Sequence, residues 1–376
     1  MSSRLFSPIR LRGLELPNRV VVAPMSMYSA TDGCAGNWHL QHVAQFGLSG
    51  AGLFMIEASA VEAEGRSSLR CLGLYDDACE AALGRVLDYS RRLGVCAIGI
   101  QLGHSGRKAG GRPPWEGRAP LTDAEGRWQG IAPSAIPLAA DWAAPRAMEP
   151  ADFPRVRDAF VAAARRASRL GIDLVELHAA HGYLLHQFLS PLTNRRADGY
   201  GGSLEARMRF PLEVIAAVRD AWPADRPLGM RISATDWLDG GFNPDEAVVF
   251  VRAAQALGCD YVCVSTGGLD PAAPVPLREG YQVPFAARIR ADTGMVTRTA
   301  GLIVHARHAD TIIATGEADQ VVLARTMIDD PRWVWHAAEA LGADVAYPKP
   351  YERAKARMWP GAALARPHDV LAPGVA

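Results

Sequence analysis

The sequence lacks an excess of charge of either sign and any apolar run long enough to cross a membrane. Its 376 residues include 40 lysines and arginines and 40 aspartates and glutamates, so the formal net charge is zero. Without a basic excess there is little attraction for phosphates, which argues against a nucleic-acid partner. No stretch approaches the roughly 18 apolar residues of a membrane span, and residues 1–8 lack the apolar region of a secretory signal. We therefore expect a cytoplasmic enzyme with neither a nucleic-acid nor a membrane partner.

The sequence also lacks cysteine pairs of the kind that bind metals or form disulfide frameworks. The six cysteines are Cys34, Cys71, Cys79, Cys96, Cys259 and Cys263. None belongs to a C-x-x-C pair, so an iron–sulfur cluster has too few ligands. Reduced and mostly buried thiols are the expected state.

Eight short β-rich runs are each followed by a helical pattern. The runs are 20–23, 53–56, 96–100, 174–177, 228–232, 261–264, 295–297 and 320–323, and amphipathic segments include 153–170, 204–221, 244–257 and 305–315. Most runs are continuously apolar, as in strands buried on both faces. Eight such units predict one domain over residues 1–376 that forms a TIM (β/α)₈ barrel. A doubly wound sheet is the alternative.

Two segments depart from this repetition. Residues 103–148 are rich in proline, tryptophan and glycine and lack helical periodicity. A long insertion after the third strand of a barrel is expected to cap the active site. Residues 348–376 form a proline-containing tail beyond the eighth unit. We expect this tail to wrap the surface or to reach a neighbouring subunit.

The segment 177–183 carries two histidines and a tyrosine directly after the fourth apolar run. His178, His181 and Tyr183 would place two neutral hydrogen-bond donors and one weak acid at the mouth of the barrel. Such a set suits an enzyme that holds a carbonyl and delivers a proton beside it. A metal site is an alternative, but no carboxylate or cysteine follows with ligand spacing. Two structural histidines are a further alternative.

Other polar residues stand at or near the ends of the expected strands. Gln101 and Arg231 interrupt apolar runs, and a buried arginine needs a polar or anionic partner, which could be a ligand or an internal carboxylate. Gly301 and Arg325 follow the seventh and eighth strands, where such barrels commonly bind phosphate. A solvent-facing Arg325 remains the alternative.

Taken together, these residues resemble the Old Yellow Enzyme family of FMN-dependent ene-reductases, and in particular its xenobiotic-reductase or thermophilic-like branch. The matching motifs are L-P-N-R at 16–19, A-P-M at 23–25, E-A at 57–58, Gln101, H-S-G-R-K-A at 104–109, H-A-A-H-G-Y at 178–183, D-G-Y-G-G-S at 198–203, Arg231, and Arg325 with D-P at 330–331. They occur in the family's order over roughly residues 5–355. The resemblance implies a TIM barrel that binds FMN non-covalently at its mouth.

The resemblance also implies a role for each matching residue. The flavin would be lined by Pro24, Met25, Ser26 and Ala58, its pyrimidine side bonded by Gln101 and Arg231, and its phosphate held by Gly301, Leu302, Ala324 and Arg325. NAD(P)H would reduce the flavin, using the same pocket as the substrate. His178 and His181 would bind the carbonyl or nitro oxygen of an activated alkene, which Tyr28 would contact. Hydride would pass from flavin N5 to the β-carbon, and Tyr183 would protonate the α-carbon.

The family resemblance further implies a homodimer or higher homo-oligomer and no metal. A tail arginine or tryptophan would reach the neighbour's pocket, with Arg353 the first candidate and Trp359 the second. A surface role for Arg353 is the alternative.

Several positions depart from the family pattern. Ser26 replaces the usual cysteine, from which we expect an altered flavin potential, and Ala324 replaces a glycine before the phosphate arginine. Two other functions stay open. A flavin-free hydrolase or aldolase would need a carboxylate pair or a Schiff-base lysine at the strand ends, and Glu57 with Glu176 is a weak candidate pair. A flavin-binding redox sensor with little turnover is compatible with Ser26.

Overall fold

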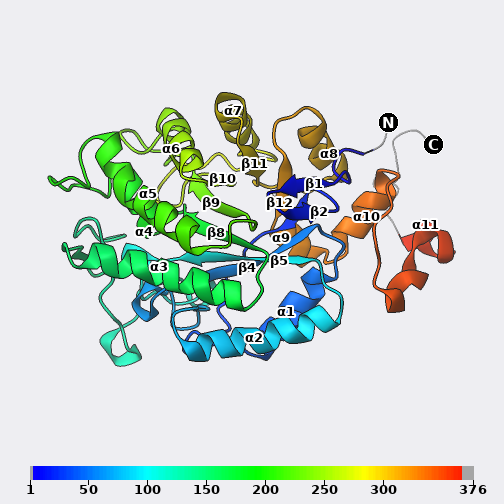
Figure 1. Cartoon of the computed structure of the whole chain (residues 1–376), viewed down its shortest axis with the longest axis horizontal. Coiled ribbons are helices and arrows are strands. Elements are labelled where there is room, and N and C mark those ends of the chain that lie inside the picture. The colour runs from blue at the N-terminus through cyan, green and yellow to red at the C-terminus, as the bar shows by residue number, and fades with distance from the viewer. Residues whose placement is uncertain (1–2, 366–376) are drawn as a thin grey trace.

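Eight parallel strands close into a barrel in the computed structural model, which describes residues 3–365 (Figure 1). They are β3 (Val20–Val22), β4 (Leu53–Ala60), β5 (Ala97–Gly103), β8 (Leu174–Ala179), β9 (Leu228–Ser233), β10 (Tyr261–Ser265), β11 (Val296–Thr299) and β12 (Gln320–Leu323). Neighbours in the ring follow chain order, and β12 pairs with β3 to close it. The predicted (β/α)₈ barrel is confirmed. The doubly wound alternative is wrong, because such a sheet has open edges.

Helices surround the barrel on its outer side (Figure 1). They are α1 (Asn37–Gly47), α2 (Asp77–Arg92), α3 (Asp152–Arg169), α5 (Leu204–Ala221), α6 (Pro244–Ala256), α7 (Val283–Thr293), α8 (Ala306–Ala314) and α10 (Trp333–Ala340), with shorter α4 (Leu184–Leu189), α9 (Arg325–Asp329) and α11 (Ala362–Ala365). Side-chain caps fix some starts: Asn243 Oδ1 accepts the amides of Asp245 and Glu246 at 3.0 and 3.2 Å. None of the helices within residues 3–365 is long and apolar enough to cross a membrane.

A small hairpin that the sequence did not predict precedes the barrel. Its strands are β1 (Ile9–Leu11) and β2 (Leu14–Leu16), which are too short to show an alternating pattern. The Gly13 amide donates to Asp225 O at 2.9 Å, and a Cβ at Gly13 would lie 2.8 Å from that oxygen. Leu11 and Leu16 are buried. The hairpin therefore packs closely on the loop before β9, at the amino-terminal end of the barrel.

The strand register brings the polar residues of the barrel side by side. Ala58 pairs with Gln101, and Gln101 pairs with Glu176. His178 pairs with Arg231, so β8 extends beyond the predicted run, which ended at Leu177. Pairing with β9 continues the strand there although the apolar pattern has stopped. His178 thus lies within a strand, a more rigid position than the loop after it.

The insertion and the tail differ in where they lie. The insertion contains short helical turns and two two-residue strands, β6 (Ile131–Ala132) and β7 (Arg146–Ala147). The start of the tail runs beside α10, where the ring centroids of Trp335 and Tyr351 are 6.3 Å apart (Figure 1). The surface wrap expected for the tail is found in its first part. Residues 366–376 of the predicted tail lie outside the described residues.

Candidate active site

Two adjoining cavities open at the carboxyl ends of the barrel strands. The first has a volume of about 570 Å³ and the second about 510 Å³. Ala23, His181, Arg231 and Ala324 line both, so the cavities meet at these four residues. Together they form one elongated site in the place where (β/α)₈ enzymes carry theirs.

Most residues that the sequence placed at the site line one of these cavities. The first is lined by Pro24, Ser26, Tyr28, Ala58, Gln101, His178, His181, Tyr183, Arg231 and Ala324. The second adds Gly301, Leu302 and Arg325. Two predicted residues line neither: Met25 is packed into the hydrophobic core, and Arg353 is exposed on the tail.

His178, His181 and Tyr183 form one cluster. The two imidazole centroids are 5.3 Å apart with the rings nearly perpendicular, at 82°. The Tyr183 ring stacks on His178 with centroids 4.4 Å apart. The local sequence produces this arrangement because β8 carries His178 while the turn before α4 carries the other two.

The surroundings keep the three side chains uncharged. Burial, followed by the nearby Arg231, lowers the pKa of both His178 and His181 well below the ordinary value. His178 Nδ1 accepts the Ala180 amide at 3.2 Å, so the proton of the neutral ring lies on Nε2. Burial also raises the pKa of Tyr183. The cluster can therefore offer imidazole N–H donors and a protonated phenol at neutral pH.

Hydrogen bonds hold His181 in a backbone conformation that few non-glycine residues adopt. Its φ is 55°, in the left-handed region. Its amide donates to Ser233 Oγ at 2.9 Å, and its Nε2 lies 2.7 Å from Ser265 Oγ. Gln282 Nε2 donates to the same Ser265 hydroxyl at 3.1 Å. The side chain of His181 is thus linked to β10 and to the segment before α7.

Gln101 and Arg231 line the first cavity together with the two histidines, but the two residues differ in their hydrogen-bond partners. Gln101 Nε2 donates to Glu176 Oε1 at 2.7 Å inside the barrel. Glu176 Oε2 is 3.7 Å from Arg298 Nη1, so Arg298 forms the internal ion pair that was the alternative for Arg231. Within residues 3–365, the buried Arg231 Nε has no hydrogen-bond partner. Arg231 also lines both cavities, so its guanidinium group is placed to donate to an acceptor on a ligand.

Two consecutive residues with positive φ, Gly301 and Leu302, line one side of the second cavity and are called the cradle below. Gly301 has φ 103°, and a Cβ there would lie 3.0 Å from the Gln282 side chain. Leu302 follows with φ 55°. Arg325 lines the same cavity from the start of α9, although its side chain is largely exposed. Glycine permits close approach to an anion, and the arginine adds a complementary charge.

Three basic residues of the insertion line the first cavity, and the sequence analysis did not single them out. They are Lys108, Arg112 and Arg118. Lys108 Nζ donates to His181 O at 2.7 Å and to Gly268 O at 2.5 Å. Leu138, Ala139 and Trp142 add apolar surface from the same insertion. The only signal for Lys108 was its place in the H-S-G-R-K-A motif.

The structure does not form the carboxylate pair of a hydrolase. A bulge in β4 turns Glu57 toward α1, where its Oε1 lies 3.3 Å from His39 Nε2. Glu176 is held inside the barrel, and neither carboxylate lines the two cavities. Among residues 3–365, no three His, Cys, Asp or Glu side chains gather closely enough to hold a metal ion.

Comparison with known proteins agrees with this geometry. Residues 4–344 match the model of the NADH:flavin oxidoreductase / NADH oxidase family. The chain is 41% identical over 355 residues to an NADPH dehydrogenase of Geobacillus thermodenitrificans, which covers 94% of this chain and 99% of that protein. The chain belongs to the Old Yellow Enzyme family. A further NADPH dehydrogenase, from Listeria monocytogenes, is 40% identical over 354 residues, 94% of this chain and 99% of that protein.

Solved structures also resemble this chain in fold. Morphinone reductase in complex with tetrahydroNAD superposes with a TM-score of 0.74 at 30% identity, over 92% of this chain and 93% of that one. A 2-naphthoyl-CoA reductase reaches a TM-score of 0.80 at 24% identity over 90% of this chain and 52% of that one, which shows the fold alone.

As an Old Yellow Enzyme family member, the protein is an oxidoreductase that uses FMN and NAD(P)H. The residues present fit FMN. Apolar Ala23, Pro24 and Ala58 offer a surface for a flat ring system beside the unpaired Arg231. The cradle at Gly301, with Arg325 beside it, fits a terminal phosphate. A flavin-free hydrolase or aldolase is therefore not supported.

Proposed function

We propose that this enzyme reduces the activated C=C bonds of α,β-unsaturated carbonyl and nitro compounds with electrons from NAD(P)H. The observation that carries the proposal is the cluster of two neutral histidines and a protonated tyrosine in the first cavity. Imidazole N–H groups can donate hydrogen bonds to an electronegative oxygen while keeping their protons. A phenol that retains its proton can act as the general acid beside them.

Each residue has a separate role in this reaction. FMN, when bound, would supply the redox chemistry that couples oxidation of NAD(P)H to reduction of the alkene. His178 and His181 bind the acceptor oxygen and so polarise the double bond. Tyr183 gives its phenolic proton to the α-carbon. Tyr28 would contact the substrate, and Arg231 and Gln101 would hold the ring of the cofactor.

The insertion shapes the range of substrates. Leu138, Ala139 and Trp142 line the first cavity together with Pro271. These apolar side chains suit small alkenes with a ring or chain attached, and they exclude water from the reacting carbon. We further propose a homodimer or higher homo-oligomer.

The proposal is tested by following the two half-reactions separately. Under anaerobic conditions, NADPH should bleach the flavin of the holoenzyme, and cyclohexenone should restore its absorbance. Tyr183→Phe should slow the second step by roughly 10² or more, a typical contribution of a general acid, while bleaching by NADPH is largely retained.

Two outcomes would contradict this reading. Equal slowing of both steps in Tyr183→Phe would remove the proton-donor role. A wild-type enzyme that is bleached by NADPH but not reoxidised by any enone or nitroalkene would favour the redox-sensor alternative.

A further inference from the structure

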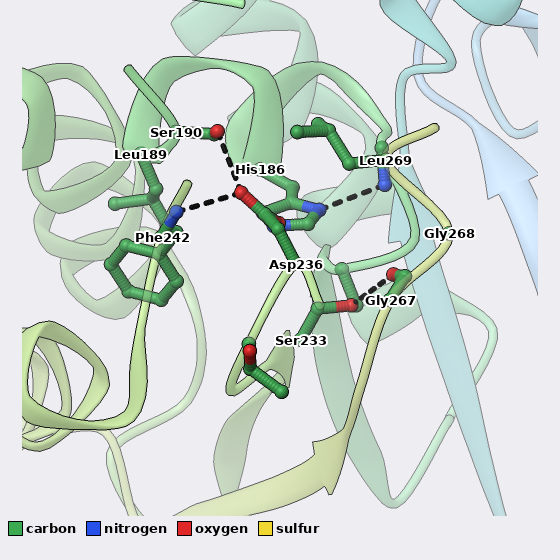
Figure 2. Close-up of polar contacts among 12 residues, drawn as sticks. His186, Leu189, Ser190, Ser233, Asp236, Phe242, Gly267, Gly268 and Leu269 are labelled. Carbon is green, nitrogen blue, oxygen red and sulfur yellow. Dashed lines mark hydrogen bonds and ion pairs between the residues drawn. The ribbon is translucent and has the colours of Figure 1, made fainter. Parts of the chain in front are cut away.

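Another histidine, outside the cluster of His178, His181 and Tyr183, pairs with a carboxylate away from the cavities. His186 lies in α4 and Asp236 follows β9, and both side chains are fully buried, at 0% exposure. Neither residue lines the two cavities. Figure 2 shows the pair enclosed between α4 and the loop that carries Gly267, Gly268 and Leu269. The turn formed by residues 180–183, between β8 and α4, is called the substrate loop below.

The pair is connected to the substrate loop by one hydrogen bond. The Gly182 amide donates to His186 Nδ1 at 2.8 Å. On the other side of the ring, His186 Nε2 lies 2.9 Å from Asp236 Oδ1. Asp236 Oδ2 accepts from the Ser190 hydroxyl and from the Phe242 amide, both at 2.7 Å (Figure 2). His186 and Asp236 thus connect the Gly182 amide to the Ser190 hydroxyl and the Phe242 amide.

The substrate loop needs such support because its backbone is strained. His181 and Gly182 have consecutive positive φ values of 55° and 72°. A conformation of this kind persists at a functional site only when the surroundings determine it. Three contacts do so: Ser233 accepts the His181 amide, Lys108 donates to the His181 carbonyl, and His186 accepts the Gly182 amide.

The hydrogen bonds require one particular tautomer of His186. Only an unprotonated ring nitrogen can accept an amide N–H, so Nδ1 must be bare and Nε2 must carry the proton. The carboxylate of Asp236 faces that proton and favours this form. Burial alone would raise the pKa of Asp236, but His186, Ser190 and the Phe242 amide together lower it, so the group stays charged.

The same arrangement occurs twice more around the barrel mouth. His39 Nδ1 accepts the Gly36 amide at 3.0 Å while Nε2 faces Glu57 at 3.3 Å. His104 Nδ1 accepts the Gly106 amide at 3.0 Å, and Nε2 faces Glu62 at 3.4 Å. A carboxylate–histidine–amide arrangement is therefore a repeated means of fixing loops in this fold. Of the three, only His186 bonds directly to the substrate loop.

We propose that His186 and Asp236 are positioning residues, which set the places of His181 and Tyr183 by fixing the imidazole tautomer that accepts the Gly182 amide. The inference rests on the proposed roles of His181 and Tyr183. It assigns no contact with substrate or cofactor to the pair itself.

Asp236→Asn is the most specific variant, because it keeps the shape and changes only the donor pattern. Asparagine has one oxygen and one NH₂ group where aspartate has two oxygens. Its oxygen can therefore accept from Phe242 or from His186, but not from both. If it faces Phe242, the new NH₂ group faces His186 Nε2 and forces the proton onto Nδ1. The protonated Nδ1 and the Gly182 amide are then two donors that face each other, so the substrate loop must move.

Two substitutions of His186 separate loop placement from stability. In His186→Asn, the side-chain oxygen replaces Nδ1 and can accept the Gly182 amide, but Asp236 loses its donor. In His186→Gln, the side-chain nitrogen replaces Nε2 and serves Asp236, but the Gly182 amide loses its acceptor. The first should therefore be less stable yet bind ligand well, and the second more stable yet bind ligand poorly.

The experiment measures binding and loop exposure in FMN-loaded enzyme. The probe is para-hydroxybenzaldehyde, whose phenolic oxygen is suited to the histidine pair, followed by the change in flavin absorbance. Amide hydrogen exchange of the peptide over 178–189 and the thermal midpoint are measured in parallel. Val214→Ala, a fully buried site in α5, serves as a control that lowers stability without touching the loop.

Asp236→Asn should weaken probe binding roughly tenfold or more, as is typical for supporting residues, and should speed exchange in 178–189. Val214→Ala should lower the thermal midpoint and leave both readouts unchanged. The proposal is overturned if Asp236→Asn binds the probe like wild type, or if binding in all variants simply follows their stability. If wild type itself does not bind the probe, the proposed function fails, while the exchange data still test the positioning role.

Discussion

Lys108 is the residue at which the charge of the cavity depends on pH. Burial, together with Arg107 and Arg118, lowers the pKa of its ammonium group to about 7. Its contacts are the carbonyl oxygens of His181 and Gly268, which accept from either the charged or the neutral amine. The hydrogen bonds to the loop can therefore survive deprotonation, whereas the positive charge beside the cavity cannot.

We expect the binding of an anionic ligand to weaken severalfold as the pH rises through about 7, because Lys108 loses its charge there. Para-hydroxybenzoate is a suitable probe, since its carboxylate is ionised on both sides of this range, and phenol is the neutral control. The dissociation constants are measured by flavin absorbance. Lys108→Met should flatten the profile for the anion. A profile that persists in this variant would assign the pH dependence to another group.

Residue by residue, the sequence predicted best those side chains that follow a strand. His178, His181 and Arg231 stand in or directly after apolar runs, so the barrel topology alone brings them together. Lys108 and Trp142 lie in an insertion without periodicity, and nothing local indicates that Lys108 contacts Gly268, which is 160 residues away. The His186–Asp236 pair was missed because each partner is unremarkable without the other.

At the scale of elements, residues with strained backbone lie in the loops after the strands, and the regular pairing of the strands fixes where these loops begin. The loop after β11 shows this most clearly. Gly301 has φ 103° and lies against Gln282, which donates to Ser265, the partner of His181. Gly301 in the second cavity and His181 at the junction of the two cavities are thus joined by a short series of side chains.

Gly301→Ala should lower FMN occupancy and destabilise the protein by about 1–3 kcal/mol, the usual range for a strained residue. The added Cβ would meet Gln282 at 3.0 Å in a conformation that alanine rarely adopts. The readouts are the flavin-to-protein ratio and the free energy of unfolding. Gly342→Ala is a matched control, with φ 65° and nothing within 4 Å of its Cβ. Equal flavin loss in both variants would show that the contact with Gln282 is unimportant.

The elements themselves were largely predictable because periodicity and burial agree along most of the chain. All eight barrel strands and the helices α3, α5, α6 and α8 lie where the sequence placed them, within a few residues. The hairpin of β1 and β2 was missed, since strands of three residues carry too little pattern. The end of β8 was set too early because pairing with β9, not hydrophobicity, extends the strand to Ala179.

At the scale of the whole molecule, the described part of the tail and the residues just before it lie away from the cavities of their own chain. Ala346, Tyr347 and Pro348 line a depression together with Phe6 and Pro17, near the amino-terminal end of the barrel. Arg353 follows in this segment and is exposed. Its predicted role at the site thus requires a second copy of the chain.

A mixed dimer of two impaired variants tests this requirement. If Arg353 serves a neighbour's site, Arg353→Ala should weaken substrate binding, and a mixed dimer with Tyr183→Phe should regain one intact site. The measurement is enone turnover by the mixed dimer, purified with two different tags, against each parent. Arg357→Ala, another exposed arginine of the tail, should behave like wild type. A mixed dimer no more active than its parents would leave Arg353 as a surface residue.

The segment between Gly103 and Met148 has a consequence for how this enzyme can diversify. It supplies Arg112, Arg118, Leu138 and Trp142 to the cavity wall, while the barrel strands and the turn before α4 supply the reacting groups. Mutations at these four wall positions can therefore alter which molecules are admitted while the side chains of the proposed chemistry stay in place. In evolutionary terms, selectivity can change through this stretch, although Lys108 within it also holds the His181 loop.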